Sequence, residues 1–143
     1  MRRERLRRLD DAACLARLHA PSFAKPWDAA AFAELLADNV ALGCARGFIM
    51  LRVVADEAEI LTLAVAPPHR RCGLGRALVK RACAWARAAG ADALHLEVAE
   101  NNKEAHALYQ SAGFVDTGLR PRYYGKHAAR LMRRSLRGGK TKR

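Results

Sequence analysis

The sequence predicts an α/β fold in which a mixed sheet, with parallel and antiparallel strands, carries helices on both faces. Three observations lead to this prediction. Apolar residues recur with helical spacing in some segments and alternate in others, in the order β, α, α, β, β, β, α, β, α, β, β. A basic, glycine-containing turn at residues 63–78 joins a strand to a helix. The chain of 143 residues, 51% of them hydrophobic, is long enough for one compact domain.

The first half is expected to contain two helices and an antiparallel meander. An acidic cap followed by apolar residues at positions 12, 15, 16 and 18 predicts a helix that ends at Pro21. A second helix is expected over 29–37, capped by Asp28, with Pro26 and Trp27 packed just before it as a hydrophobic staple. Three strand-like runs separated by short polar turns follow, at 40–45, 48–55 and 59–66.

The second half is expected to alternate helices and strands. An apolar stripe over 74–89 predicts a helix with Trp85 in the core and Gly90 as its C-terminal cap. The run 93–99 alternates between apolar and polar residues, as a strand with one buried face does. A short helix capped by Asn102 and two more strands complete the sheet, with expected ranges of 103–112, 114–117 and 129–136.

The net charge of +12 comes from the two ends of the chain. Residues 1–8 carry five arginines and one glutamate, residues 117–143 carry ten basic residues and no acid, and residues 9–116 have a net charge of −2. We expect the tail at 137–143 to be a disordered extension. The alternative is that the basic ends give weak, salt-dependent affinity for RNA or ribosomes.

The sequence has no pattern typical of a membrane span, a secretion signal or a metal site. No apolar run approaches the length of a membrane span, and the arginine-rich start has no apolar segment behind it, so we expect a cytoplasmic protein without membrane contact. The four cysteines form no metal-ligand spacing, which favours reduced thiols and no metal.

The strand–turn–helix segment at 63–78 is typical of a phosphate-binding loop. Glycines at 73 and 75 let the backbone approach an anion, and the first turn of the helix directs free N–H groups and its positive dipole end toward it. Arg70, Arg71 and Arg76 add positive charge. The third glycine of a dinucleotide fingerprint and the lysine of a Walker loop are both missing. The alternative is a tight connection that binds nothing.

Two separated motifs resemble the GNAT family of N-acetyltransferases. The first, Arg70-x-x-Gly73-x-Gly75 after Leu-Ala-Val, is similar to the pyrophosphate loop of that family. The second is Asn102-x-x-Ala-x-x-Leu-Tyr109-x-x-x-Gly-Phe. Together with Pro26-Trp27 and Arg122-Tyr123-Tyr124, they resemble the ribosomal-protein alanine N-acetyltransferase branch over residues 10–136. The resemblance implies one GNAT domain over 1–136, acetyl-coenzyme A as cofactor, and a protein N-terminus as acceptor, such as that of ribosomal protein S18.

Site residues follow from the resemblance and from the chemistry of acyl transfer. Trp27, Tyr123 and Tyr124 are candidates for the wall of the acceptor site, with ordinary core packing as the alternative. The strand before the loop would offer backbone groups to the pantetheine arm and the thioester. The cofactor residues implied are Leu63, Ala64, Val65, Arg70, Arg71, Cys72, Gly73, Leu74, Gly75, Arg76, Asn102 and Tyr109.

Glu97 and Tyr109 are the candidate catalytic residues for direct attack of an amine on the thioester in a ternary complex. An α-amine loses its proton more readily than lysine does, and Glu97 is the candidate base, provided that burial raises the pKa of its carboxyl. Tyr109 is the candidate acid for the departing thiolate. His95 on the same strand face as Glu97 is a competing base. The alternatives are that Glu97 is a solvated strand residue and that Tyr109 packs, with a hydroxyl that only binds the sulfur.

Two other functions remain open from the sequence. The same scaffold serves acetyltransferases for lysine or small amines by changing loops. Members of the ribosomal-protein alanine N-acetyltransferase branch usually carry an acidic residue just before the last strand. This chain has the short basic run 125–130 there, which bears on the choice of acceptor. From a different class, the chain is a candidate for a non-catalytic basic module that binds RNA or ribosomes.

Overall fold

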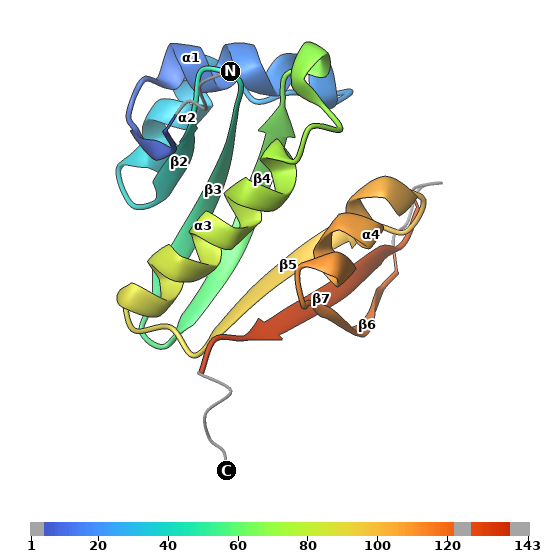
Figure 1. Ribbon diagram of the computed structural model, residues 1–143. Coiled ribbons are helices and arrows are strands. Elements are labelled where there is room, and N and C mark those ends of the chain that lie inside the picture. The colour runs from blue at the N-terminus through green and yellow to red at the C-terminus, as the bar shows by residue number, and fades with distance from the viewer. Residues whose placement is uncertain (1–4, 122–126, 138–143) are drawn as a thin grey trace. The chain divides into compact units, whose positions relative to one another are not determined.

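The structure, a computed structural model, describes residues 5–121 and 127–137, and its elements follow the predicted order (Figure 1). The helices are α1 (Ala12–His19), α2 (Ala29–Leu36), α3 (Leu74–Ala88) and α4 (Lys103–Ser111), with short 3-10 turns η1 (Ala20–Ser22) and η2 (Pro67–His69). The strands are β1 (Arg7–Leu9), β2 (Val40–Cys44), β3 (Gly47–Val54), β4 (Glu57–Val65), β5 (Ala93–Ala99), β6 (Val115–Arg120) and β7 (Ala129–Ser135).

The strands form one sheet in the order β1-β2-β3-β4-β5-β7-β6. Strands β1, β2 and β3 pair antiparallel, as do β5, β7 and β6. Strand β4 pairs with β5 in parallel, through residues 57–59 and 93–95. The predicted mixed sheet is therefore confirmed, with the parallel pair between the strand that precedes the glycine loop and the strand that carries Glu97.

The described residues divide into two compact units. The first contains the residues up to Arg52 together with Leu61–Ala82, and the second contains Val53–Ile60 and the residues from Cys83 onward. Strands β3 and β4 and helix α3 contribute residues to both units. The single domain expected over 1–136 stays a prediction.

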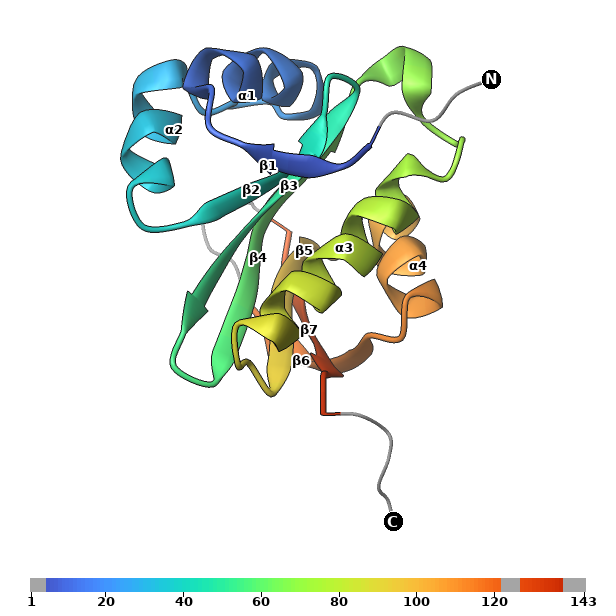
Figure 2. The ribbon, with the colours of Figure 1, turned by 60° about the vertical axis from the view of Figure 1, so that its left-hand side comes forward.

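The core of the first unit lies between helices α1 and α2 and the strands beside them (Figure 2). Asp11 and Asp28 cap the two helices, and Asp28 accepts a hydrogen bond from the backbone of Ala31 at 2.9 Å. The ring of Trp27 lies 5.6 Å from that of Phe32. These residues directly precede the cap and occupy the fourth helical position, so the predicted hydrophobic staple is confirmed.

The second unit contains β5, β7, β6 and α4, which lies along β5 and β7 in Figure 1. Leu94, Leu96 and Val98 of β5 are buried while Glu97 on the same strand is exposed, which confirms the predicted alternation. Asn102 caps α4 by accepting a hydrogen bond from Ala105 N at 3.1 Å. Gly113 ends this helix region with φ +96°, a conformation that glycine adopts at little cost.

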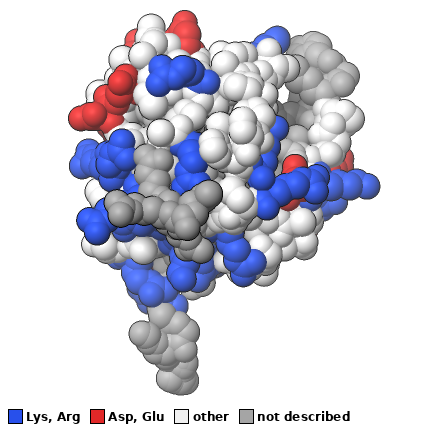
Figure 3. Space-filling model, turned by 45° about the horizontal axis from the view of Figure 1, so that its top comes forward, with Lys and Arg blue, Asp and Glu red and all other residues white. Residues whose placement is uncertain are grey.

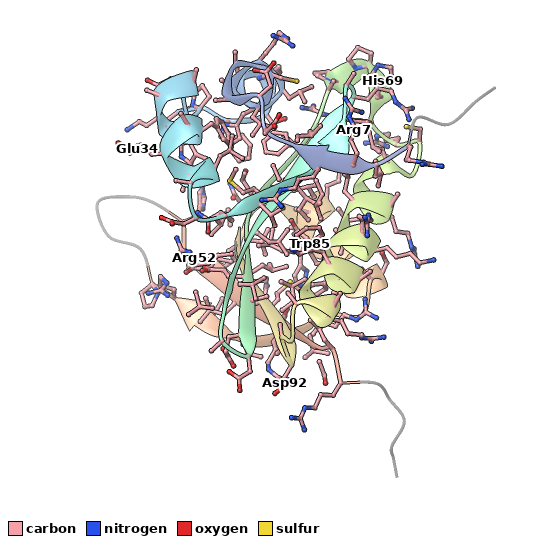
Figure 4. The ribbon with its side chains drawn as sticks, turned by 90° about the vertical axis from the view of Figure 1, so that its left-hand side faces the viewer. Arg7, Glu34, Arg52, His69, Trp85 and Asp92 are labelled. Atoms are coloured by element: carbon pink, nitrogen blue, oxygen red, sulfur yellow. The ribbon has the colours of Figure 1, made fainter. Side chains whose placement is uncertain are left out.

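Helix α3 buries a face that differs from the predicted stripe. Val79 and Cys83 are buried together with positions 74, 78, 82 and 86 of the predicted stripe, whereas Ala89 is exposed and lies just after the helix. The centre of the buried face is therefore rotated away from Trp85. The indole, labelled in Figure 4, is therefore only half-buried, and the prediction that it belongs to the core is wrong. Gly90 follows the helix with φ +99°, as predicted for its C-terminal cap.

Strand β6 is longer than predicted and irregular. It extends to Arg120, and its register against β7 shifts by one residue between Asp116 and Gly118. Such a bulge reverses which face each later side chain occupies. No helix among the described residues has the length and apolarity that a membrane span requires.

Candidate functional site

The glycine loop occupies the turn from η2 into α3, where Figure 4 labels His69. Gly73 has φ +88° and Arg71 has φ +63°, so two residues of the turn, one position apart, have positive φ. A Cβ atom added to Gly73 would meet no other atom within 4 Å. The backbone here is open to a ligand on the side that a side chain would block, as the predicted phosphate loop requires.

The side chains of the loop have different orientations. Arg71, Cys72 and Arg76 are exposed, and the first turn of α3 contains no acidic residue. Leu74 was an expected cofactor residue, but its side chain is buried, so only its backbone is available to a ligand. The thiol of Cys72 donates to the carbonyl oxygen of His69 at 2.6 Å, which makes Cys72 a residue that helps to shape the turn.

Arg70 makes contacts that the sequence did not indicate. Its Nε donates to the carbonyl oxygen of Val65 at 3.0 Å, and its Nη2 donates to Oγ of Ser22 at 2.9 Å. The carbonyl of Val65, an expected pantetheine ligand, therefore already has a partner within the first unit. Leu63 is half-buried and Ala64 is buried, so both offer a ligand mainly their backbone groups.

Glu97 lies on the exposed face of β5 in the second unit and forms an ion pair. Its Oε2 lies 3.0 Å from Nη2 of Arg120, and the Glu97 side chain is 33% exposed. The bulge in β6 makes this pair possible, because the shifted register aligns Arg120 with Ala129 of β7, the residue that also pairs with Ala99 of β5. Arg120 consequently occupies the same face as Glu97.

Sequence reasoning missed Arg120, and it placed Glu97 on the polar face of its strand, with burial as the condition for its role as base. A glycine inside a strand often marks a bulge, so Gly118 was the one available signal for the reversed face. The carboxylate pairs with a neighbouring cation through Oε2 and is 33% exposed, so it is not enclosed in an apolar pocket.

Tyr109 is buried at the end of α4, with its ring 5.7 Å from that of Phe114 in an edge-to-face arrangement. Burial raises the pKa of its hydroxyl well above the usual value of 10, because the charged phenolate would lose its hydration. The hydroxyl stays protonated over the whole physiological range and is available as a donor. Asn102 is exposed at the other end of this helix, where its Oδ1 serves as the cap.

His95 lies close to a carboxylate of the neighbouring strand. Its Nε2 is 3.0 Å from Oε1 of Glu57, although this approach lacks hydrogen-bond geometry and Nε2 has no hydrogen-bond partner among the described residues. The side chains of His95 and Glu97 share a face, as predicted, but each has a different charged neighbour.

Trp27 is the one expected acceptor-site residue that the structure describes. Its side chain is 36% exposed and stacks on the buried His19, with ring centroids 5.0 Å apart. Tyr123 and Tyr124 lie outside the described residues. The described residues contain no group of three or more His, Cys, Asp or Glu side chains placed to hold a metal ion.

Several known proteins are similar to this chain in sequence and in fold. The model of the acetyltransferase (GNAT) family matches residues 4–114. A putative ribosomal protein bS18-alanine N-acetyltransferase of Bacillus subtilis is 30% identical over 125 residues, which cover 82% of this chain and 83% of the relative. The bS18-alanine N-acetyltransferase of Escherichia coli K12 is 42% identical over 77 residues, which cover 54% of this chain and only 52% of the relative.

A solved structure agrees with the family assignment. The crystal structure of the ribosomal-protein-S18-alanine N-acetyltransferase from Escherichia coli superposes with a TM-score of 0.84 at 29% identity, covering 97% of this chain and 99% of the other. The chain belongs to the GNAT acetyltransferase family, and its mixed seven-stranded sheet is the GNAT fold. Within that family, it is similar to proteins named as bS18-alanine N-acetyltransferases.

The loop geometry fits the pyrophosphate of a coenzyme A molecule. An open backbone at Gly73, a helix N-terminus without acids, and the exposed cations Arg71 and Arg76 together supply what a doubly charged anion needs.

Proposed function

We propose that this protein is an N-acetyltransferase that uses acetyl-coenzyme A to acetylate the N-terminal α-amine of a protein, with a ribosomal protein such as S18 as the preferred acceptor. The observation that carries the proposal is the open, basic turn at Gly73 in a chain of the GNAT family. The names of the relatives at 30% and 42% identity support the choice of acceptor.

The residues of the first unit would hold the cofactor. We assign the pyrophosphate to the backbone of residues 71–76 with the side chains of Arg71 and Arg76, and the pantetheine arm to the backbone of Leu63 and the N–H of Val65. Acetyl-coenzyme A supplies the activated acetyl group as a thioester. A backbone N–H directed at the carbonyl oxygen would stabilise the charge that develops there, an effect of the order of a few kcal/mol for each donor.

The residues of the second unit would move protons. Glu97 accepts the proton of the attacking amine, directly or through water, once its ion pair with Arg120 opens. Tyr109 donates a hydrogen bond to the departing sulfur from a hydroxyl that burial keeps protonated. Because burial raises the pKa of this hydroxyl, it stabilises the thiolate by that hydrogen bond more readily than by giving up its proton. Because both substrates bind together and the amine attacks directly, no covalent acyl-enzyme forms.

Localisation and further partners are part of the same proposal. We propose that the protein acts in the cytoplasm as a single domain over 1–136. The basic ends of the chain, residues 1–8 and 117–143, would add weak and salt-dependent contact with RNA or ribosomes. On the face drawn in Figure 3, Lys and Arg cover more of the surface than Asp and Glu do.

Steady-state assays with three acceptor classes test the proposed activity. A peptide that begins with Ala should be acetylated with a higher kcat/KM than a lysine peptide with a blocked N-terminus or a polyamine. Equal or higher rates with the latter two would reject the N-terminal acceptor and favour a lysine or small-amine acetyltransferase. Salt-sensitive RNA binding without turnover of any amine would favour the non-catalytic module.

Two substitutions test the catalytic roles. Glu97→Gln should lower kcat at least about 100-fold, the usual contribution of a general base, while calorimetry shows an unchanged Kd for acetyl-coenzyme A. The matched control is Glu100→Gln on an exposed residue after the same strand, which should leave kcat unchanged. Tyr109→Phe keeps the buried ring and should lower kcat about 10-fold or more if the hydroxyl acts on the sulfur. A full rate in Glu97→Gln would contradict the assignment of the base.

A further inference from the structure

Arg70 connects the glycine loop to the segment 20–27, within the first unit. Its two hydrogen bonds, to the Val65 carbonyl at 3.0 Å and to Ser22 Oγ at 2.9 Å, come from nitrogens of one planar guanidinium. Because the group is rigid, the bond to the end of β4 fixes the direction of the bond to Ser22. One side chain of the loop therefore sets the position of the start of segment 20–27.

The far end of segment 20–27 is held by His19, which is buried. The N–H of Trp27 donates to Nδ1 of His19 at 3.2 Å, and the rings of Phe23 and Trp27 stack on the imidazole with centroids 4.0 and 5.0 Å away. Since Nδ1 accepts, the neutral ring carries its proton on Nε2, which donates to Thr62 Oγ1 at 3.1 Å. Segment 20–27 is thus anchored to the glycine loop at one end and to the core at the other.

We propose that Arg70 is a positioning residue for the acceptor, acting through Ser22, in addition to its place in the phosphate loop. The inference rests on the proposed function, because segment 20–27 carries Trp27, the described candidate for the acceptor wall. An anion bound at residues 71–76 orders the loop, the loop orders Arg70, and Arg70 orders the start of the segment. Cofactor and acceptor should then strengthen each other's binding by the same factor.

Kinetics of Ser22→Ala give the first test. At saturating acetyl-coenzyme A, the variant should raise the KM for an Ala-starting peptide about fivefold, the effect of losing one partly exposed bond to a charged donor. The Kd for acetyl-coenzyme A measured without peptide should stay unchanged within about twofold. Arg70→Lys keeps the charge but loses the planar fork, so it should raise the peptide KM at least as much. The matched control is Ser111→Ala, which removes an exposed serine of the second unit and should change neither constant.

A double-mutant cycle tests whether the two substitutions act on one shared contact. That contact is the bridge, the pair of hydrogen bonds by which Arg70 joins Val65 to Ser22. The double variant should be no worse than Arg70→Lys alone, because both substitutions remove the same bond. Multiplied effects on the peptide KM, or a Kd for acetyl-coenzyme A that rises about fivefold in Ser22→Ala even without peptide, would overturn the inference.

The effect of coenzyme A on the affinity for the peptide gives a second test. A purely structural role of Arg70 and Ser22 would leave this effect unchanged. Coenzyme A, which lacks the acetyl group, should lower the Kd of the peptide at least about fivefold in the parent protein. This factor should fall to near one in Ser22→Ala. The same factor in both proteins would contradict the inference.

A third measurement does not require turnover and so separates failure of the inference from failure of the proposed function. In a Trp85→Phe background, Trp27 is the only tryptophan left. Its acrylamide quenching should increase in Ser22→Ala, while circular dichroism shows that the fold is retained. If no amine is acetylated, the proposed function fails, and the quenching result still decides whether the bridge orders the segment. Unchanged quenching overturns the inference.

Discussion

The aromatic cluster around His19 in the first unit and the charged face of β5, β7 and β6 in the second unit hold their polar groups in opposite ways. His19 is 1% exposed and has a hydrogen-bond partner at each ring nitrogen. These two partners, and the aromatic rings that it contacts, are all uncharged. The side chains of Glu97 and Arg120 are 33% and 56% exposed, so their ion pair lies on the surface in contact with solvent.

The comparison shows that burial decides how much a polar contact contributes. Desolvation lowers the pKa of His19 from 6.5 to about 4, so the neutral form is fixed in the folded protein. Solvent and salt screen the pair of Glu97 with Arg120, and such pairs open readily. A buried, stacked cluster suits the proposed wall of an acceptor site, whereas an exposed ion pair suits the proposed general base.

The largest effect is expected from Phe32→Ala, which removes a fully buried ring from the cluster. The free energy of unfolding should fall by about 3–5 kcal/mol in urea titrations, because the substitution leaves a cavity beside His19 and Phe48. The matched control is Phe23→Ala, whose ring also stacks on His19 but is 40% exposed. It should cost less than about 1 kcal/mol. Equal losses would show that the two rings do not differ in burial in solution.

The second effect is a pH dependence of stability that arises from His19. Between pH 6.5 and about 4 the unfolded state binds a proton at this residue and the folded state does not, so stability falls as pH falls. The loss over this window should be up to about 3 kcal/mol. His19→Gln should lack this part of the slope, and His127→Gln, at an exposed histidine, should keep it. Identical slopes in all three proteins would rule out a buried neutral His19.

The smallest effect is expected on the charged face. Arg120→Gln should lower the free energy of unfolding by less than about 1 kcal/mol, and the difference should shrink further in high salt, because the pair is exposed. Denaturant titrations at low and high salt measure it. A loss that is larger and independent of salt would mean that the pair is enclosed in solution, and would remove the contrast with His19.

Much of the local structure could be predicted from the sequence because its causes lie within a few residues. The order of elements, the caps Asp28 and Asn102 and the staple of Trp27 on Phe32 all depend on contacts within one helical turn. The boundaries differ by a few residues, and the buried face of α3 was misplaced because packing against other elements decides it.

The sequence by itself determined the family, the glycine loop and the candidates Glu97 and Tyr109, because short motifs with fixed spacing specify them. Only the tertiary structure decided what surrounds these residues: the bulge that turns Arg120 toward Glu97, and the bond from Arg70 to Ser22, which is 48 residues away along the chain. Such contacts depend on strand register and on how distant segments pack, and no local pattern encodes either.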